Sequence, residues 1–115
     1  MATSSERAQK NTSPAKPFDL KAAIAAKLSA DGDRVAMDVY GVTIDVKSMA
    51  LWSEAEINET QIMGAFEVLK YAFGEENVQK LRDAVKATGE ELTLLHARLL
   101  MEEFQRRSGL GRPGE

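Results

Sequence analysis

One change of hydrophobic period constrains the fold of this chain more than any other feature of its sequence. Between residues 35 and 46 apolar and polar residues alternate, whereas the longer segments on either side repeat their apolar residues every three or four positions. Alternation is typical of a strand with one buried face, and the longer period is typical of a helix. Because Gly41 divides the alternating segment into two short runs, we expect a β-hairpin at about 34–47. An isolated hairpin is marginal in water, so its apolar face must lie on the helices or join another sheet.

The segment before the hairpin has the pattern of a single helix. Leu20, Ile24 and Leu28 recur every four residues and therefore share one stripe. Asp19 is placed to cap this helix, since its carboxylate accepts hydrogen bonds from amides of the first turn. We expect the packed part of the chain to begin one residue earlier, at Phe18.

Three helices are predicted after the hairpin. Ser53 and Glu56 have the spacing of a capping box and start the first, and Gly74 is suited to end it because glycine adopts the left-handed conformation readily. The apolar face between these signals consists of Ile62, Ala65, Phe66, Leu69, Ala72 and Phe73. A second helix at about 75–87 has a narrower apolar stripe, made of Val78, Leu81 and Val85.

The last helix is the most informative part of the sequence. Thr88 and Glu91 repeat the capping-box spacing, so we expect this helix to begin there and to end near Arg107. Its apolar residues extend well past half the circumference: Leu92, Leu94, Leu95, Ala97, Leu99, Leu100, Met101 and Phe104. One contact with a small domain needs an apolar arc of roughly 100°. Either this helix is packed between two elements of its own domain, or it has a second face for a partner.

The composition is that of one globular domain. A chain of 115 residues is long enough for a single core, and 43% hydrophobic with 29% charged residues is an ordinary balance. There is no cysteine, no apolar stretch near the ~20 residues of a membrane span, and no apolar segment typical of a secretory signal near the N-terminus. We expect a cytosolic protein that does not enter a membrane.

These observations predict a mainly α fold with a small β-hairpin (α+β). Its order is an N-terminal helix, a two-stranded hairpin and a three-helix C-terminal bundle. Residues 1–17 are polar and contain two prolines, so we expect a disordered tail. A single helical domain should cover 18–107, and the glycine-rich residues 108–115 should form a flexible tail.

No group of residues has the pattern of a catalytic, cofactor or metal site. His96 is the single histidine and has no cysteine to share a metal with. The glutamate pairs at 75–76 and 102–103 are adjacent on helices, so their side chains diverge by about 100°. With a net charge of -3 and no concentrated basic patch, nucleic-acid binding is not indicated. We therefore predict a non-enzymatic protein without a cofactor.

A surface for a protein partner is predicted instead. On the last helix we expect Leu94, Ala97, Met101 and Phe104 to lie outermost and to contact the partner. Trp52 is a second candidate, because tryptophan is enriched at binding hot spots. The alternative for Trp52 is a structural contact with the first turns of the following helix.

The order of several short segments resembles a known family. These segments are Phe18-Asp19-Leu20, Tyr40-Gly41-Val42, the turn with Trp52, the stretch from Phe73-Gly74-Glu75-Glu76 through Leu81, and the final helix from Leu92 to Phe104. Over residues 18–108 the chain is similar to the tail assembly chaperones of long-tailed bacteriophages, particularly those infecting actinobacteria.

The resemblance implies a partner and a location. Members of this family bind the long, aggregation-prone tape measure protein in the host cytoplasm and keep it soluble until tail-tube subunits polymerise around it. They are not retained in the mature virion. Many are also made as a second, longer form by ribosomal frameshifting. The tape measure protein and that longer form of the chain are thus the expected partners, and self-association remains open.

Two other classes of protein also remain open. A structural head–tail connector or tail-completion protein would assemble into a ring. A small DNA-binding regulator would use the junction at 73–75 as the turn of a helix-turn-helix motif. The helix after that junction, however, carries Glu75, Glu76 and Asp83 against Lys80, Arg82 and Lys86, which is a poor balance for contacts with phosphates.

Overall fold

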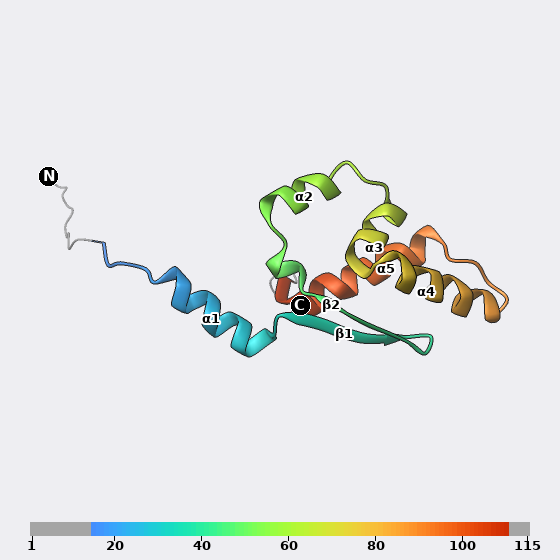
Figure 1. Ribbon diagram of the computed structural model, residues 1–115, viewed down its shortest axis with the longest axis horizontal. Helices are drawn as coiled ribbons and strands as arrows, with labels where there is room; N and C mark the ends of the chain where they lie inside the picture. The colour runs from blue at the N-terminus through green and yellow to red at the C-terminus, as the bar shows by residue number, and fades with distance from the viewer. Residues whose placement is uncertain (1–14, 111–115) are drawn as a thin grey trace, which may run out of the picture.

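A computed structural model describes residues 15–110 of the chain (Figure 1). The elements are α1 (Leu20–Asp31), β1 (Arg34–Val39), β2 (Val42–Lys47), the short turn η1 (Met49–Leu51), α2 (Glu54–Thr60), α3 (Ala65–Phe73), α4 (Glu75–Ala87), α5 (Leu94–Gln105) and the final wide turn η2 (Arg106–Leu110). The protein is mostly helical with one two-stranded antiparallel hairpin. The predicted α+β class is confirmed. Residues 1–14 and 111–115, and the tails predicted there, lie outside the described part.

The hairpin forms where the alternating pattern predicted it. β1 and β2 pair antiparallel from Arg34 opposite Lys47 to the tip. Tyr40 and Gly41 form the two-residue connection, with φ of 53° and 82°. A tight turn with φ positive at both central residues is the type I′ turn, which fits the twist of a hairpin. On one face of the hairpin Val35, Met37 and Ile44 are buried, as the alternation requires.

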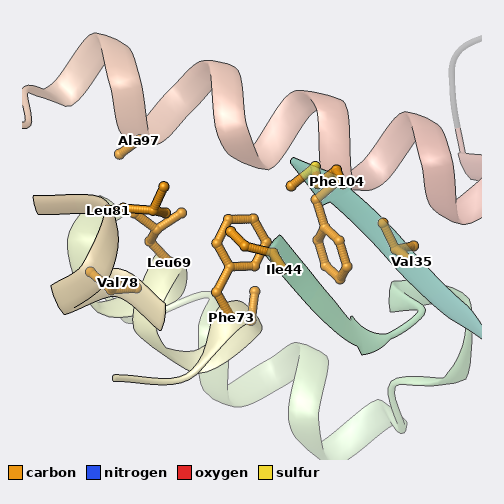
Figure 2. Packing of buried hydrophobic residues seen from close by; sticks show 10 residues of the cluster. Val35, Ile44, Leu69, Phe73, Val78, Leu81, Ala97 and Phe104 are labelled. Carbon is orange, nitrogen blue, oxygen red and sulfur yellow. The ribbon is translucent and has the colours of Figure 1, made fainter. Parts of the chain in front are cut away.

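The core lies between this face and three helices, α3, α4 and α5 (Figure 2). The three predicted stripe residues of α4 are each 0% exposed: Val78, Leu81 and Val85. Phe73 of α3 meets Phe104 of α5 edge to face, with ring centroids 5.5 Å apart and an interplanar angle of 88°. An aromatic pair of this geometry contributes about 0.5–1.5 kcal/mol beyond the burial of its area. The hairpin and the C-terminal helices therefore share one core.

The helix predicted from residue 53 to 73 is two helices, α2 and α3. The capping box of Ser53 and Glu56 is confirmed and starts α2. A second start signal follows, because the Gly64 amide donates to Glu67 Oε1 at 2.9 Å at the beginning of α3. Glycine inside a helix costs about 1 kcal/mol relative to alanine, which favours a break here. Ile62, expected on the buried face, lies in this break and is 89% exposed. Four helices rather than three follow the hairpin.

The last helix begins at Thr93, so the predicted start at Thr88 is wrong. Thr88 instead ends α4, since its hydroxyl donates to the Val85 carbonyl at 2.6 Å. The next residue, Gly89, has φ of 89°, and a helix does not continue through that conformation. At Thr93 the amide donates to His96 Nδ1 at 2.9 Å, which completes a different N-terminal cap.

The C-terminal end of the helical body is hydrogen-bonded to the hairpin and to η1, the turn that follows it. Ser108 is 4% exposed, and its hydroxyl oxygen accepts from the Met49 amide at 3.0 Å. Arg107 Nη1 donates to the Ala36 carbonyl of β1 at 2.9 Å. The prediction of a flexible tail from residue 108 onward is therefore wrong for 108–110, because these two contacts hold η2 against the body.

The first helix is formed but is not part of the core. Its cap is confirmed, since Asp19 Oδ1 accepts from the Ala22 amide at 3.0 Å. No residue of α1 is buried, and the helix projects away from the body (Figure 1). Phe18 is 76% exposed, so the prediction that packing begins there is wrong. Among the described residues, the first buried one is Val35 of β1. The C-terminal helices cover the inner face of the hairpin, so that face is not available to α1.

Candidate partner-binding surface

The inner face of α5 contains most of the residues that were predicted to face a partner. Ala97 and Phe104 are 0% exposed, and Met101 is partly buried against the core. The prediction that the helix residues lie outermost is wrong for these three, whereas Leu94 is 47% exposed. Ala97, Met101 and Phe104 are spaced four and three residues apart, which is the spacing of a single inward-facing stripe. The small Ala97 faces the core above Leu81 (Figure 2), where a larger side chain would keep the helices apart.

The opposite face of α5 carries leucines that nothing covers. Counted from Ala97 at 100° per residue, Leu95 and Leu99 lie about 160° and 200° around the helix. Leu95 is 65% exposed and Leu99 is 54% exposed, and Leu94, on the flank of the helix about 60° from Ala97, is 47% exposed. We call Leu94, Leu95 and Leu99 the outer stripe. Helix α5 therefore has a second apolar face that its own domain does not enclose.

A shallow apolar groove adjoins the outer stripe. It lies between the hairpin tip, α4 and α5 and has a volume of about 180 Å³. Its lining consists of Val39, Tyr40, Leu81, Val85, Leu92, His96, Leu99 and Leu100. Because Leu99 belongs both to the groove and to the outer stripe, the two form one continuous apolar area.

Tyr40, like Leu95 and Leu99, is a residue of this surface that was not predicted as a partner residue. Its side chain is 53% exposed at the hairpin tip, and its φ is 53°. A bulky residue with positive φ is uncommon, and such a conformation costs on the order of 1–3 kcal/mol. Asparagine before glycine is the relaxed choice for this turn. The dipeptide Tyr40-Gly41 between two β runs was the available signal for an aromatic ring placed at the tip.

His96 forms the polar edge of the groove. Its Nδ1 accepts the Thr93 amide hydrogen, so the neutral ring carries its proton on Nε2. Nε2 lies 4.0 Å from Glu90 Oε1. Both ring nitrogens thus have partners from the loop before α5. Within residues 15–110, no group of three or more histidine, aspartate or glutamate side chains is arranged to hold a metal ion.

Trp52, the second predicted partner residue, faces the core. It is half-buried and packs edge to face on Tyr71, with centroids 5.5 Å apart. It also lies against Phe104 at 5.9 Å. Because Trp52 has two ring partners inside the protein, it forms part of the edge of the core. The prediction of an exposed aromatic anchor is wrong.

A small polar network around Glu56 lies beside this aromatic pair. Glu56 accepts from the Ser53 amide at 2.8 Å, and Lys47 and the Tyr71 hydroxyl also donate to its carboxylate. The Ser53 amide is the main cause that holds the pKa of Glu56 below its ordinary value. Burial, followed by the charge of Glu56, raises the pKa of Tyr71. These bonds join the hairpin, α2 and α3.

The polar face of α4 does not form a basic stripe. Lys80 Nζ lies 3.7 Å from Glu76 of the same helix, and Arg82 Nη1 donates to Gln79 at 2.9 Å. Gln79 in turn donates to Asp83 at 3.1 Å. Lys80 is thus paired with an acidic residue of its own helix, and Asp83 lies beside the glutamine that Arg82 contacts, which does not favour phosphate binding.

Comparisons with protein-family models, with curated proteins and with solved structures find nothing that matches this chain. No helix among residues 15–110 is long and apolar enough to cross a membrane. The function has to be inferred from the surface itself.

Proposed function

We propose that this protein is a non-enzymatic binding protein that holds apolar helical segments of another polypeptide on the outer stripe of α5. One observation carries this proposal: Leu94, Leu95 and Leu99 are 47%, 65% and 54% exposed on a helix whose other face is in the core. Contiguous apolar surface of this kind marks interaction sites more often than it occurs by chance. The stripe lies on a helix fixed by its own packing, so it is available without a conformational change.

The client we propose is the tape measure protein of a long-tailed bacteriophage, and the role is that of a tail assembly chaperone in the host cytoplasm. The resemblance in the order of short segments supports this role, and the uncovered leucines suit it. A tape measure protein is long and offers many apolar helical segments. In the proposed role, the chaperone leaves the client before the virion is complete.

The size of the stripe predicts weak binding at each site. Complete burial of a leucine side chain contributes about 1.5–3 kcal/mol, and about half of that remains to be gained at Leu94, Leu95 and Leu99. Three such side chains supply only a few kcal/mol before the cost of association is subtracted. Many copies bound along one long client would compensate for this through multivalency. A holding chaperone needs such reversible contacts, because tail-tube subunits must later displace it.

The test is co-expression with the tape measure protein encoded in the same genome. The wild-type chain should raise the soluble fraction of that client. Leu95→Glu places a charge in the middle of the outer stripe without touching the core, and it should weaken client binding by about thirtyfold or more. The soluble and insoluble fractions of the client are measured after centrifugation.

A matched control is available at Ile62, which is 89% exposed outside this surface. Ile62→Glu makes the same chemical change and should leave client solubility as in wild type. If the wild-type chain does not keep the client soluble, the chaperone role is wrong. If Leu95→Glu retains full effect, the client binds elsewhere. A six- or twelvefold ring in light scattering would favour a head–tail connector.

A further inference from the structure

A second uncovered apolar surface lies on α1, at the other end of the chain. Phe18, Leu20 and Ile24 are 76%, 59% and 48% exposed. At the C-terminal end of α1, Lys27 and Asp31 form an ion pair at 2.9 Å. Asp31 lies so close to Gly109 of η2 that an added Cβ at Gly109 would be 2.7 Å from Asp31 Oδ2. Helix α1 projects away from the body (Figure 1), and none of its residues lines the groove of its own copy.

We propose that α1 of one copy docks in the groove of a second copy, and that the two copies exchange their helices reciprocally in a dimer. The groove and α1 are complementary in form, since one is a concave apolar surface and the other a protruding apolar helix. At about 180 Å³ the groove is smaller than the ~300–1,000 Å³ of small-molecule pockets. Side chains that project from a helix, such as Leu20 and Ile24 one turn apart, match its size.

Charges beside the two surfaces are also complementary. Glu90, with its side chain 65% exposed, stands at the groove next to His96. On the other surface, Lys16 and Lys21 flank the start of α1 and are exposed. Docking α1 therefore brings basic side chains towards Glu90, which favours correct encounter more than it adds affinity.

Reciprocal exchange covers more apolar surface than the alternatives. It buries two helices and two grooves, whereas one-way docking leaves one of each exposed and permits open chains. Pairing of α1 with α1 would involve only 12 residues from each copy and would leave both grooves uncovered. The exchange covers Leu99 but leaves Leu94 and Leu95 open, so it does not depend on the proposed client and overlaps with client binding only at Leu99.

The test measures the mass of the full chain by light scattering over a concentration series. Ile24→Glu on α1 and Leu99→Glu in the groove should each weaken dimerisation by about thirtyfold or more. Ala26→Glu is the matched control, since residue 26 lies about 160° around α1 from Ile24 and is exposed. This variant should dimerise as wild type does.

Mixing the two variants distinguishes docking of α1 in the groove from α1–α1 pairing and from groove–groove pairing, and a wild-type mass that stops at the dimer distinguishes reciprocal exchange from one-way docking. Ile24→Glu retains an intact groove, and Leu99→Glu retains an intact α1. Together they should form a mixed dimer with one docked helix, while each alone stays monomeric at the same concentration. Tyr40→Asn replaces the aromatic ring that lines the groove by a residue that suits the turn. It should weaken the dimer without a loss of folding, as judged by circular dichroism.

Three results would overturn the proposal. One is a wild-type chain that stays monomeric from micromolar to millimolar concentration. Another is a Leu99→Glu variant that dimerises normally, as α1–α1 pairing would allow. The third is a larger closed ring. Leu95→Glu separates this proposal from the chaperone role, because it should dimerise normally and fail only in holding the client.

Discussion

The two helices α1 and α5 differ in what holds them in place. Each has 12 residues and an apolar stripe. Helix α5 has Ala97 and Phe104 in the core at 0% exposure, whereas α1 has no buried residue. The first helix instead relies on five alanines, which have the highest helix propensity, and on its Asp19 cap. Helicity can therefore be specified locally, but burial depends on what the rest of the chain covers first.

The difference has a consequence for binding. A helix without a buried residue, such as α1 with Leu20 and Ile24 exposed, has an apolar stripe available to another surface, and it suits the role of an inserted ligand. A helix with one buried face, such as α5, presents its other face on a rigid support. The two proposed interactions use the two helices in these different ways.

The largest effect is expected when a core side chain of α5 is truncated. Phe104→Ala should lower the free energy of unfolding by about 3–5 kcal/mol, because it removes a ring packed on Phe73 and Trp52. Ile24→Ala on α1 should change it by less than about 0.5 kcal/mol. Both are measured by urea denaturation in the Leu99→Glu background, where self-association does not contribute. Equal effects would show that α1 is part of the cooperative core.

Hydrogen exchange compares the same helices without core mutations. In Leu99→Glu, amides of α1 should exchange by local opening, and central amides of α5 should exchange near the limit of global unfolding. We expect the two opening free energies to differ by about 2 kcal/mol or more. In the wild-type dimer, α1 should gain protection. Protection of α1 that is the same in both proteins would contradict docking in the groove.

The helix caps offer a smaller effect. Ser53→Ala removes the hydroxyl that accepts the Glu56 amide and should cost about 1 kcal/mol of global stability. Asp19→Ala removes the equivalent cap of α1 and should reduce helical signal in circular dichroism while global stability stays the same. A loss of global stability in Asp19→Ala would mean that α1 is coupled to the body.

The smallest effect concerns pH. Hydrogen bonds from Arg106 and Arg107 lower the pKa of Glu103 to about 2. Because this value is below the ordinary ~4.3 of an unfolded glutamate, the ionised carboxylate stabilises the folded state above about pH 4.3. That stabilisation is lost as the pH falls towards 2. Glu103→Gln should show a shallower loss of stability over this range in urea titrations. Identical slopes would exclude a role for this end of α5.

Much of the fold was predictable because local signals were strong. The alternation at 34–47, the stripe of α4 and the caps at Asp19 and Ser53 were each correct, since each depends only on residues near one another in sequence. Two helix boundaries were wrong where competing local signals existed. Gly64 with Glu67 started a new helix, and Gly89 ended one.

The binding surface was predictable only in part. The sequence by itself determined that α5 has more apolar circumference than one contact needs, because this depends on residue types and the helical period. The tertiary structure alone decided which side faces inward. Close approach of the helices selected Ala97 for the core and left Leu95 and Leu99 outside, because the space between packed helices limits side-chain size. Likewise, only the arrangement of the hairpin and α3 to α5 decided that α1 is left uncovered.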